Sequence, residues 1–303
     1  MSREGDELST GGVSVPILNA SGCLDALTAP GVAQSLDAFV TKTVTPLARE
    51  GNPPPRIAET DEWMLNSIGL QNPGIDAWVE QSYPRLRELG VPLWVSVGGF
   101  SASDYAFVCE RLDALEDVDV LELNLSCPNV DEAPETAAEL TAAARAATSK
   151  RLYAKLSPAL PDVAEAARAV ANAGADGLSL VNTLRGLALD PATLRPRLAL
   201  GPGGASGPAL RPIALACIYA CARAVELPIV GMGGIASGRD AVQFVAAGAT
   251  ALALGTILFG DPAAPGRVRA ELAAEVTSRG YASAAEIREL ARESASLSIA
   301  SAE

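Results

Sequence analysis

A thiol flanked by two carboxamides is the strongest chemical signal in the sequence. Asn124, Cys127 and Asn129 lie in the segment NLSCPN, directly after the strand-like run at residues 118–123. A cysteine can act as a base or a nucleophile, and asparagine amides can hold a flat polar ligand by hydrogen bonds. The chain contains no histidine. Proton transfer must therefore use cysteine, lysine, tyrosine or a carboxylate, and histidine triads are excluded.

The composition limits the classes of protein to which the chain can belong. Its formal net charge of −13 over 303 residues argues against binding to nucleic acid, because a phosphate backbone would be repelled. No apolar stretch is long enough to span a membrane, and the polar residues 1–12 are expected to be flexible and to carry no anchor. The five cysteines form no CxxC pair, so no metal site is predicted, and their odd number favours a cytoplasmic location.

Short apolar runs alternate with longer helical patterns along most of the chain. Strands are predicted at residues 15–20, 38–43, 93–97, 118–124, 152–156, 177–181, 229–231 and 251–254. Helices are predicted at residues 76–89, 103–115, 136–148, 162–173, 208–225 and 238–247, and two closing helices at 266–280 and 284–291 within the tail 260–303.

This alternation predicts the fold class. Strands that are apolar on both faces and joined by helices indicate a parallel sheet buried on both sides. Eight such units predict an α/β fold, with residues 1–303 forming a single (β/α)8 barrel. A doubly wound open sheet is the alternative, but no GxGxxG segment follows the first strand as that fold's dinucleotide site requires.

Polar residues gather where the predicted strands end, and in a barrel all these ends meet at one mouth. They are Ser21, Lys42, Thr43, Ser96, Asn124, Cys127, Lys155, Asn182 and Thr183. The long connections 46–73 and 183–206 would emerge at the same mouth, where barrel enzymes build their active sites. Agreement among so many strand ends predicts a functional site there.

Glycines follow the last two predicted strands, in the segments GMGGIASG (231–238) and LGT (254–256). Each precedes a predicted helix start, where backbone N–H groups and the helix dipole can bind a phosphate; tight turns without a ligand are the alternative. A phosphate site beside carboxamides and lysines suits FMN, with Lys155 near the flavin N1–C2=O edge. Alternatively, Lys155 or Lys42 could form a Schiff base in a flavin-free lyase or isomerase.

Several segments together resemble a known family. They are residues 41–45, 51–56, 66–72, 124–129, 155–158, 181–183, 203–208 and 231–235. In their order along the chain they resemble the soluble class 1 dihydroorotate dehydrogenases, FMN enzymes that make orotate in pyrimidine biosynthesis. The segment MLNSIGLQN (64–72) is closest to the class 1B catalytic subunit.

The resemblance implies a role for each matching residue. The implied FMN contacts are Ala20, Ser21, Lys42, Thr43, Ser96, Asn124, Lys155, Val181, Gly207, Gly233, Gly234, Gly255 and Thr256. The implied substrate contacts are Lys42, Asn66, Ser67, Ile68, Gly69, Leu70, Asn124, Asn129, Asn182 and Thr183. Cys127 would take the C5 proton of dihydroorotate while C6 delivers hydride to flavin N5. Ser96 departs from the asparagine that relatives often carry.

The resemblance also implies partners. The class 1B subunit works with a partner that carries FAD and an iron–sulfur cluster and passes electrons to NAD, in a homodimer or a dimer-based hetero-oligomer. Fumarate acting directly on FMN is the alternative acceptor. After Asn129 the acidic residues 130–136 replace a longer glycine-rich loop of the family. A flavoprotein relative that acts on another dihydropyrimidine, or is inactive, therefore stays open as an alternative.

Overall fold

The computed structural model describes residues 15–125, 136–288 and 290. Its main sheet consists of the parallel strands β1 (Ile17–Asn19), β2 (Phe39–Val40), β5 (Leu93–Val97), β6 (Val118–Asn124), β7 (Arg151–Leu156), β8 (Gly177–Leu180), β11 (Ile229–Met232) and β12 (Ala251–Leu254). Their order is β1-β12-β11-β8-β7-β6-β5-β2. Every predicted strand is found and every pairing is parallel. The (β/α)8 barrel is confirmed.

The two end strands, β1 and β2, are joined by one parallel backbone bridge, Leu18–Ala38, and by the side chains of Asp37 and Asn19. Asp37 N–H donates to the Ile17 carbonyl at 2.9 Å. Beyond it, the fully buried Asn19 amide donates to the Val40 carbonyl and accepts from the Val40 N–H, each at 2.8 Å. The amide thus takes the place of a backbone ladder in a region where an unpaired N–H or C=O group would be costly.

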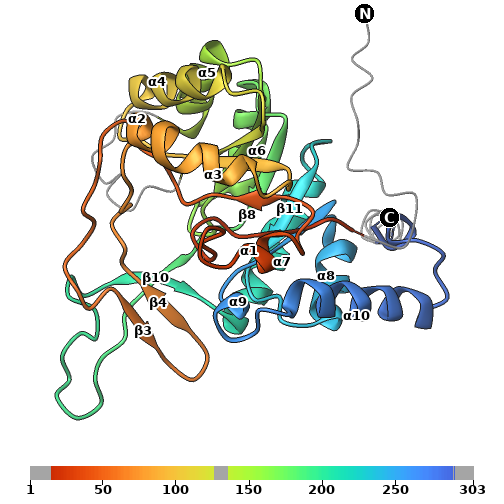
Figure 1. The fold of residues 1–303 in the computed structure, drawn as a ribbon. Coiled ribbons are helices and arrows are strands. Elements are labelled where there is room, and N and C mark those ends of the chain that lie inside the picture. Colours follow the sequence, from red (N-terminus) through yellow and green to blue (C-terminus); the bar gives the residue numbers. More distant parts are fainter. Residues whose placement is uncertain (1–14, 126–135, 289, 291–303) are drawn as a thin grey trace, which may run out of the picture.

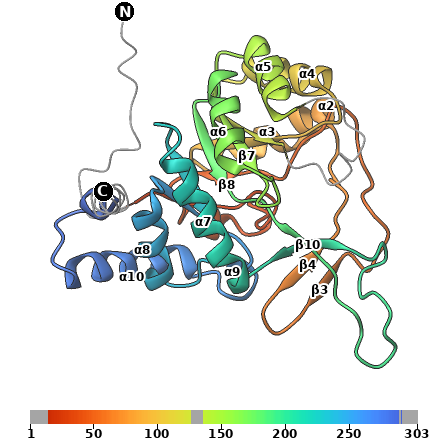
Figure 2. The ribbon, with the colours of Figure 1, turned by 180° about the vertical axis from the view of Figure 1, so that it is seen from behind.

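Helices surround the barrel (Figures 1 and 2). They are α1 (Pro30–Ala33), α2 (Ile75–Ala77), the π-helical turn η1 (Trp78–Ser82), α3 (Tyr83–Arg87), α4 (Ala102–Asp113), α5 (Ala137–Ala147), α6 (Val163–Asn172), the 3-10 turn η2 (Pro208–Leu210), α7 (Arg211–Ala222), α8 (Gly238–Ala247), α9 (Ile257–Gly260) and α10 (Ala264–Ser278). Residues 284–288 are also helical. None of these described helices is both long and apolar enough to cross a membrane.

Local chemistry explains where several helices begin. Ser101, Thr136, Asp162 and Ser237 each cap a helix by accepting a backbone N–H three residues ahead, which satisfies one of the unpaired donors of the first turn. The predicted helix 76–89 is instead divided into α2, η1 and α3. Pro84 lies at the start of α3, where its missing N–H interrupts the hydrogen-bond ladder.

The interior of the barrel has an apolar floor and a polar layer above it. Trp94 on β5 and Tyr153 on β7 pack in the floor, with ring centroids 4.7 Å apart. Successive inward residues of a strand are two apart, so Ser96 and Lys155 lie one step nearer the mouth. Glu122 on β6 and Ser179 on β8 complete the layer of four buried polar side chains.

A second sheet, which the sequence did not predict, lies beside the barrel (Figure 1). It contains β3 (Ile57–Glu59), β4 (Met64–Asn66), β9 (Leu184–Gly186) and β10 (Gly203–Ser206), in the antiparallel order β3-β4-β10-β9. The two long connections, 46–73 and 183–206, form it together. Gly204 permits the β10 backbone to lie close to Thr183, because a Cβ on Gly204 would lie 2.1 Å from the Thr183 hydroxyl.

Candidate active site

Polar side chains from four strand ends form one hydrogen-bonded network at the barrel mouth. The Thr43 and Ser96 hydroxyls are 2.9 Å apart. The Asn124 amide donates to the Thr43 hydroxyl at 3.3 Å, and the Asn182 amide donates to the Asn124 side-chain oxygen at 3.0 Å. The predicted convergence of these residues is therefore confirmed, and we refer to Thr43, Ser96, Asn124 and Asn182 as the amide network.

The amide network is held from outside the barrel. The Tyr105 hydroxyl, on α4, donates to the Asn124 carbonyl at 2.5 Å. The Asn182 side-chain oxygen accepts the Thr183 N–H at 2.9 Å. Because each amide has a partner on its oxygen or its nitrogen, its orientation is set before any ligand binds.

Two lysines and a cysteine lie beside this network. Lys155 is buried on β7, and its ammonium donates to the Glu122 carboxylate at 3.4 Å. Burial, and then the charge of Lys155, lowers the pKa of Lys42. Burial raises the pKa of the Cys23 thiol, opposed by Lys155 and Lys42. No described carboxylate forms an ion pair with Lys42, so its ammonium can receive an anionic ligand.

Sequence reasoning missed Glu122 and Cys23. Glu122 could have been found, because Val118, Val120 and Glu122 share the inward face of one strand and a carboxylate among them needs a partner. Cys23 carried no comparable signal, since it follows the strand end by several residues and reaches the mouth only through the turn after β1.

The remaining cofactor candidates line the adjoining side of the mouth. The Ser21 hydroxyl donates to the Thr41 carbonyl at 2.7 Å, beside Lys42. The Val181 N–H donates to the Met232 carbonyl at 3.1 Å, beside Gly233. A Cβ on Gly255 would make ordinary contacts with Ala20 Cβ and Cys23 Sγ, each at 3.8 Å, so Gly255 lies against the turn that follows β1. The positive charges of Lys155 and Lys42, which act on Cys23 in the same turn, favour an anionic group here.

The predicted phosphate site has free loop glycines, but the backbone at the start of α8 is partly occupied. Gly233 and Gly234 adopt positive φ values of 120° and 85°, and a Cβ on Gly234 would lie 2.9 Å from the Gly207 carbonyl. The Gly238 N–H, at the start of α8, donates to Glu271 at 2.7 Å, and this bond lowers the pKa of Glu271. The protein's own carboxylate thus occupies part of the helix end that was expected to face the anion.

Residues 66–70 form a separate wall that their own neighbours hold in place. The Asn66 amide donates to the Gly204 carbonyl at 3.3 Å, and the Ser67 hydroxyl accepts from Asn52 at 2.8 Å. Leu70 has a φ of 56°, and the buried Asn72 amide donates to its carbonyl at 2.7 Å. A left-handed leucine costs free energy and persists only where surrounding contacts impose it.

This wall includes the substrate candidates Ile68 and Gly69. The Ile68 carbonyl accepts the Asn52 N–H at 3.0 Å. Within the described part of the chain, no hydrogen bond joins residues 67–70 to the amide network. A ligand that lies between residues 67–70 and the amide network would connect the two.

The catalytic candidate Cys127 and the substrate candidate Asn129 lie outside the described residues, which stop at 125 and resume at 136. Their placement over the mouth stays a prediction. The described strand β6 ends at Asn124, three residues before Cys127 in the sequence.

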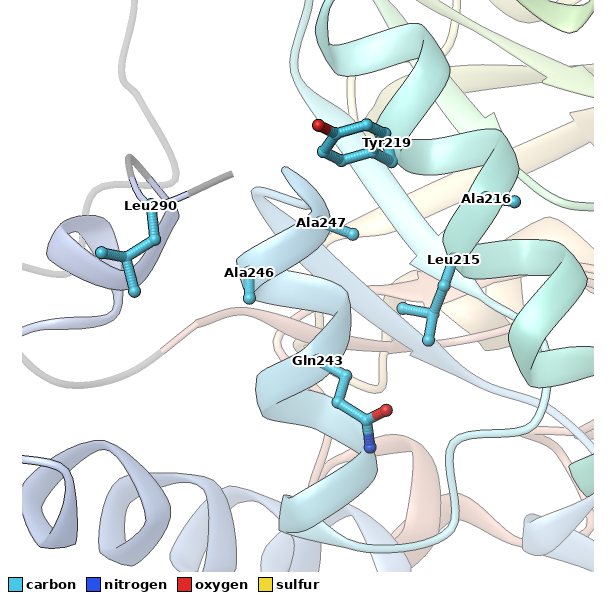
Figure 3. Close-up of a pocket in the computed structure, with 7 residues that line it drawn as sticks. All are labelled: Leu215, Ala216, Tyr219, Gln243, Ala246, Ala247 and Leu290. Carbon is cyan, nitrogen blue, oxygen red and sulfur yellow. The ribbon is translucent and has the colours of Figure 1, made fainter. Parts of the chain in front are cut away.

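A pocket of about 530 Å³ lies between α7 and α8, on the outside of the barrel (Figure 3). Its lining is mainly apolar and includes Leu215, Ala246 and Leu290. None of the predicted site residues lines it. The polar groups suited to chemistry are at the mouth, so the mouth is the candidate active site.

Comparison with known proteins agrees with this site. Residues 11–276 match the family model described as dihydroorotate dehydrogenase. The chain is 46% identical over 256 residues to "Dihydroorotate dehydrogenase B (NAD(+)), catalytic subunit" of Trichlorobacter lovleyi, covering 82% of this chain and 84% of that protein. Proteins with the same name are 45% identical in Geobacter sulfurreducens (84% and 86% covered) and 42% identical in Anoxybacillus flavithermus (93% and 93% covered). The chain therefore belongs to the dihydroorotate dehydrogenase family of oxidoreductases.

Proposed function

We propose that the chain oxidises (S)-dihydroorotate to orotate with FMN, in pyrimidine biosynthesis. The observation that carries the proposal is the amide network beside the buried Lys155 and the partly buried Lys42, at the mouth of a barrel whose sequence matches this family over residues 11–276. Family membership argues against the flavin-free lyase. A relative acting on another dihydropyrimidine stays as an outcome of the experiment below.

The described residues fit a flavin mononucleotide. The Ser179 hydroxyl is fully buried, lies in register with Lys155, and has no partner among the described residues. Gly233 follows β11 and Gly255 follows the neighbouring strand β12, so the glycines proposed for the phosphate lie on one side of the mouth. Gly233, Gly234, Gly255 and Thr256 would hold the phosphate, and Ala20, Ser21, Gly207 and Val181 would line the remainder. When bound, the flavin supplies the hydride acceptor.

The chain's own residues then orient the substrate. Asn124, Asn182 and Thr183 would hydrogen-bond the imide edge of the ring, and residues 66–70 would close the opposite side. The Lys42 ammonium would offset the substrate carboxylate, because a charge-assisted hydrogen bond is the stronger kind. Cys127 would remove the C5 proton, with Asn129 as a further substrate contact.

The electron acceptor and assembly form a further part of the proposal. The name of the relatives includes NAD(+) and "catalytic subunit", and we infer that this chain passes electrons to NAD through a partner subunit with FAD and an iron–sulfur cluster. We expect a homodimer at the centre of that complex, in the cytoplasm. The purified chain alone should oxidise dihydroorotate but should reduce NAD only after the partner is added. Direct NAD or fumarate reduction by the chain alone would contradict the assignment.

Anaerobic flavin reduction tests the proposal. The purified protein should be yellow, and dihydroorotate without oxygen should bleach it. Cys127→Ala should bind the same substrate and reduce flavin far more slowly. A yellow protein that dihydroorotate leaves unbleached would favour another dihydropyrimidine, and bleaching of Cys127→Ala at the wild-type rate would exclude Cys127 as the base.

A further inference from the structure

The buried pair of Glu122 and Lys155 holds opposite charges inside the barrel, directly below the mouth. Their side chains are 1% and 7% exposed, and the two charged groups are 3.4 Å apart. Glu122 lies on β6 and Lys155 on the neighbouring strand β7, so both point inward from adjacent strands. A charge in such a place requires a partner, since burying an isolated ion is strongly unfavourable.

Lys155 has bonding capacity that the described protein leaves unused. An ammonium has three donors, and among the described residues only Glu122 accepts from it. On the next strand, Ser179 is fully buried with its hydroxyl unpartnered in the described chain. These unused groups point to a ligand above the pair, and the contact with Glu122 limits the positions that the ammonium can adopt.

We propose that Glu122 is a positioning residue that holds the Lys155 ammonium below the cofactor and offsets part of its charge. The inference rests on the proposed function, and it concerns a residue to which that function assigns no role. Glu122 would not touch the substrate. It would act through Lys155, so that the pair together sets how strongly the site favours the reduced cofactor.

The surrounding charges support a role for Glu122 with Lys155 and a separate role for Lys42 with the substrate. The titratable groups that act on this region are Glu122, Lys42 and Cys23. Besides burial, the positive charge of Lys155 lowers the pKa of Lys42, so the two lysines repel each other. Glu122 is the described carboxylate that reduces this repulsion, and it leaves Lys42 available for the substrate.

The first experiment tests the pair without any cofactor. Glu122→Gln, Lys155→Met and the double variant of the full chain are compared by urea unfolding. Each single change should raise the unfolding equilibrium constant by about 100-fold or more, because it leaves one partner buried alone. The double variant should raise the unfolding equilibrium constant by clearly less than the product of the two single-variant factors. Multiplicative effects would overturn the inference, whether or not the protein binds FMN.

The second experiment measures the midpoint potential of the bound flavin. Glu122→Gln keeps the shape and removes the negative charge, so the reduced form should be favoured by about tenfold, a rise of about 30 mV for a two-electron couple. Glu122→Asp, which keeps the charge but shortens the reach, should give a smaller rise. Asp76→Asn, which breaks a pair with Arg111 2.7 Å away between the outer helices α2 and α4, is the matched control and should leave the potential unchanged.

The outcomes separate the inference from the proposed function. A bleachable flavin with an unchanged or lowered potential in Glu122→Gln would overturn the role of Glu122 and leave the proposed function intact. A protein that cannot bind FMN would overturn both, and the unfolding cycle would then show only a structural ion pair.

Discussion

Replacing Lys42 by methionine should weaken binding of orotate much more than binding of uracil. The two ligands share the pyrimidine ring and differ by the carboxylate that Lys42 is proposed to receive. Lys42 is partly buried and has no described carboxylate partner, so a ligand anion should gain a charge-assisted bond in a largely dry site. Such a bond contributes about 1.5–3 kcal/mol, which corresponds to about 10- to 150-fold in the dissociation constant.

Isothermal titration calorimetry of the flavin-loaded protein measures both dissociation constants directly. Lys42→Met should raise the constant for orotate by that factor and change the constant for uracil by less than about threefold. Lys42→Arg keeps the positive charge and is the matched control, with a smaller loss for orotate. Equal losses for orotate and uracil in Lys42→Met would refute the reasoning, because they would show a damaged site rather than a missing charge.

Three other predictions concern Lys42, Cys127 and Asn19. As the pH rises, orotate binding should begin to weaken at a pH below the ordinary pKa of lysine. The pKa of Lys42 is lowered, and the neutral amine that forms above it cannot pair with the carboxylate. An affinity that does not change with pH up to the ordinary lysine pKa would contradict this. Flavin reduction in Cys127→Ala should fall by at least about 100-fold in anaerobic stopped-flow measurements, the usual contribution of a positioned base, with orotate affinity retained. Asn19→Leu should destabilise the barrel by about 2–6 kcal/mol in urea unfolding, because it leaves both Val40 backbone groups unpaired, whereas Asn172→Leu on the exposed end of α6 should cost less than about 0.5 kcal/mol; similar losses in both variants would show that Asn19 does not join β1 to β2.

The barrel could be predicted because its signals are local. Each strand is a short apolar run, and each following helix has its own periodicity and often its own cap, such as Thr136 with Glu139. The mouth residues could be predicted for the same reason, since parallel strands must end at one edge. Asn124 and Asn182 are 58 residues apart in sequence, yet this rule places their amides within hydrogen-bonding distance.

The features that escaped prediction depend on contacts between distant segments. The antiparallel sheet pairs Asn66 with Gly204, and strands of three or four residues have too little periodicity to be recognised. The use of Asn19 to join β1 to β2, and of Glu271 to occupy the start of α8, likewise depends on which side chain reaches a backbone group far along the chain. Glu122 was overlooked because the sequence of β6 carries two acidic residues, Asp119 and Glu122, and a strand is recognised by its apolar residues.

Anaerobic titration of the purified flavoprotein with dihydroorotate tests the central claim most directly. The proposed site predicts that dihydroorotate bleaches the flavin stoichiometrically, and that orotate is recovered as the product. A flavin that stays oxidised in the presence of excess dihydroorotate, while another dihydropyrimidine bleaches it, would contradict the assignment.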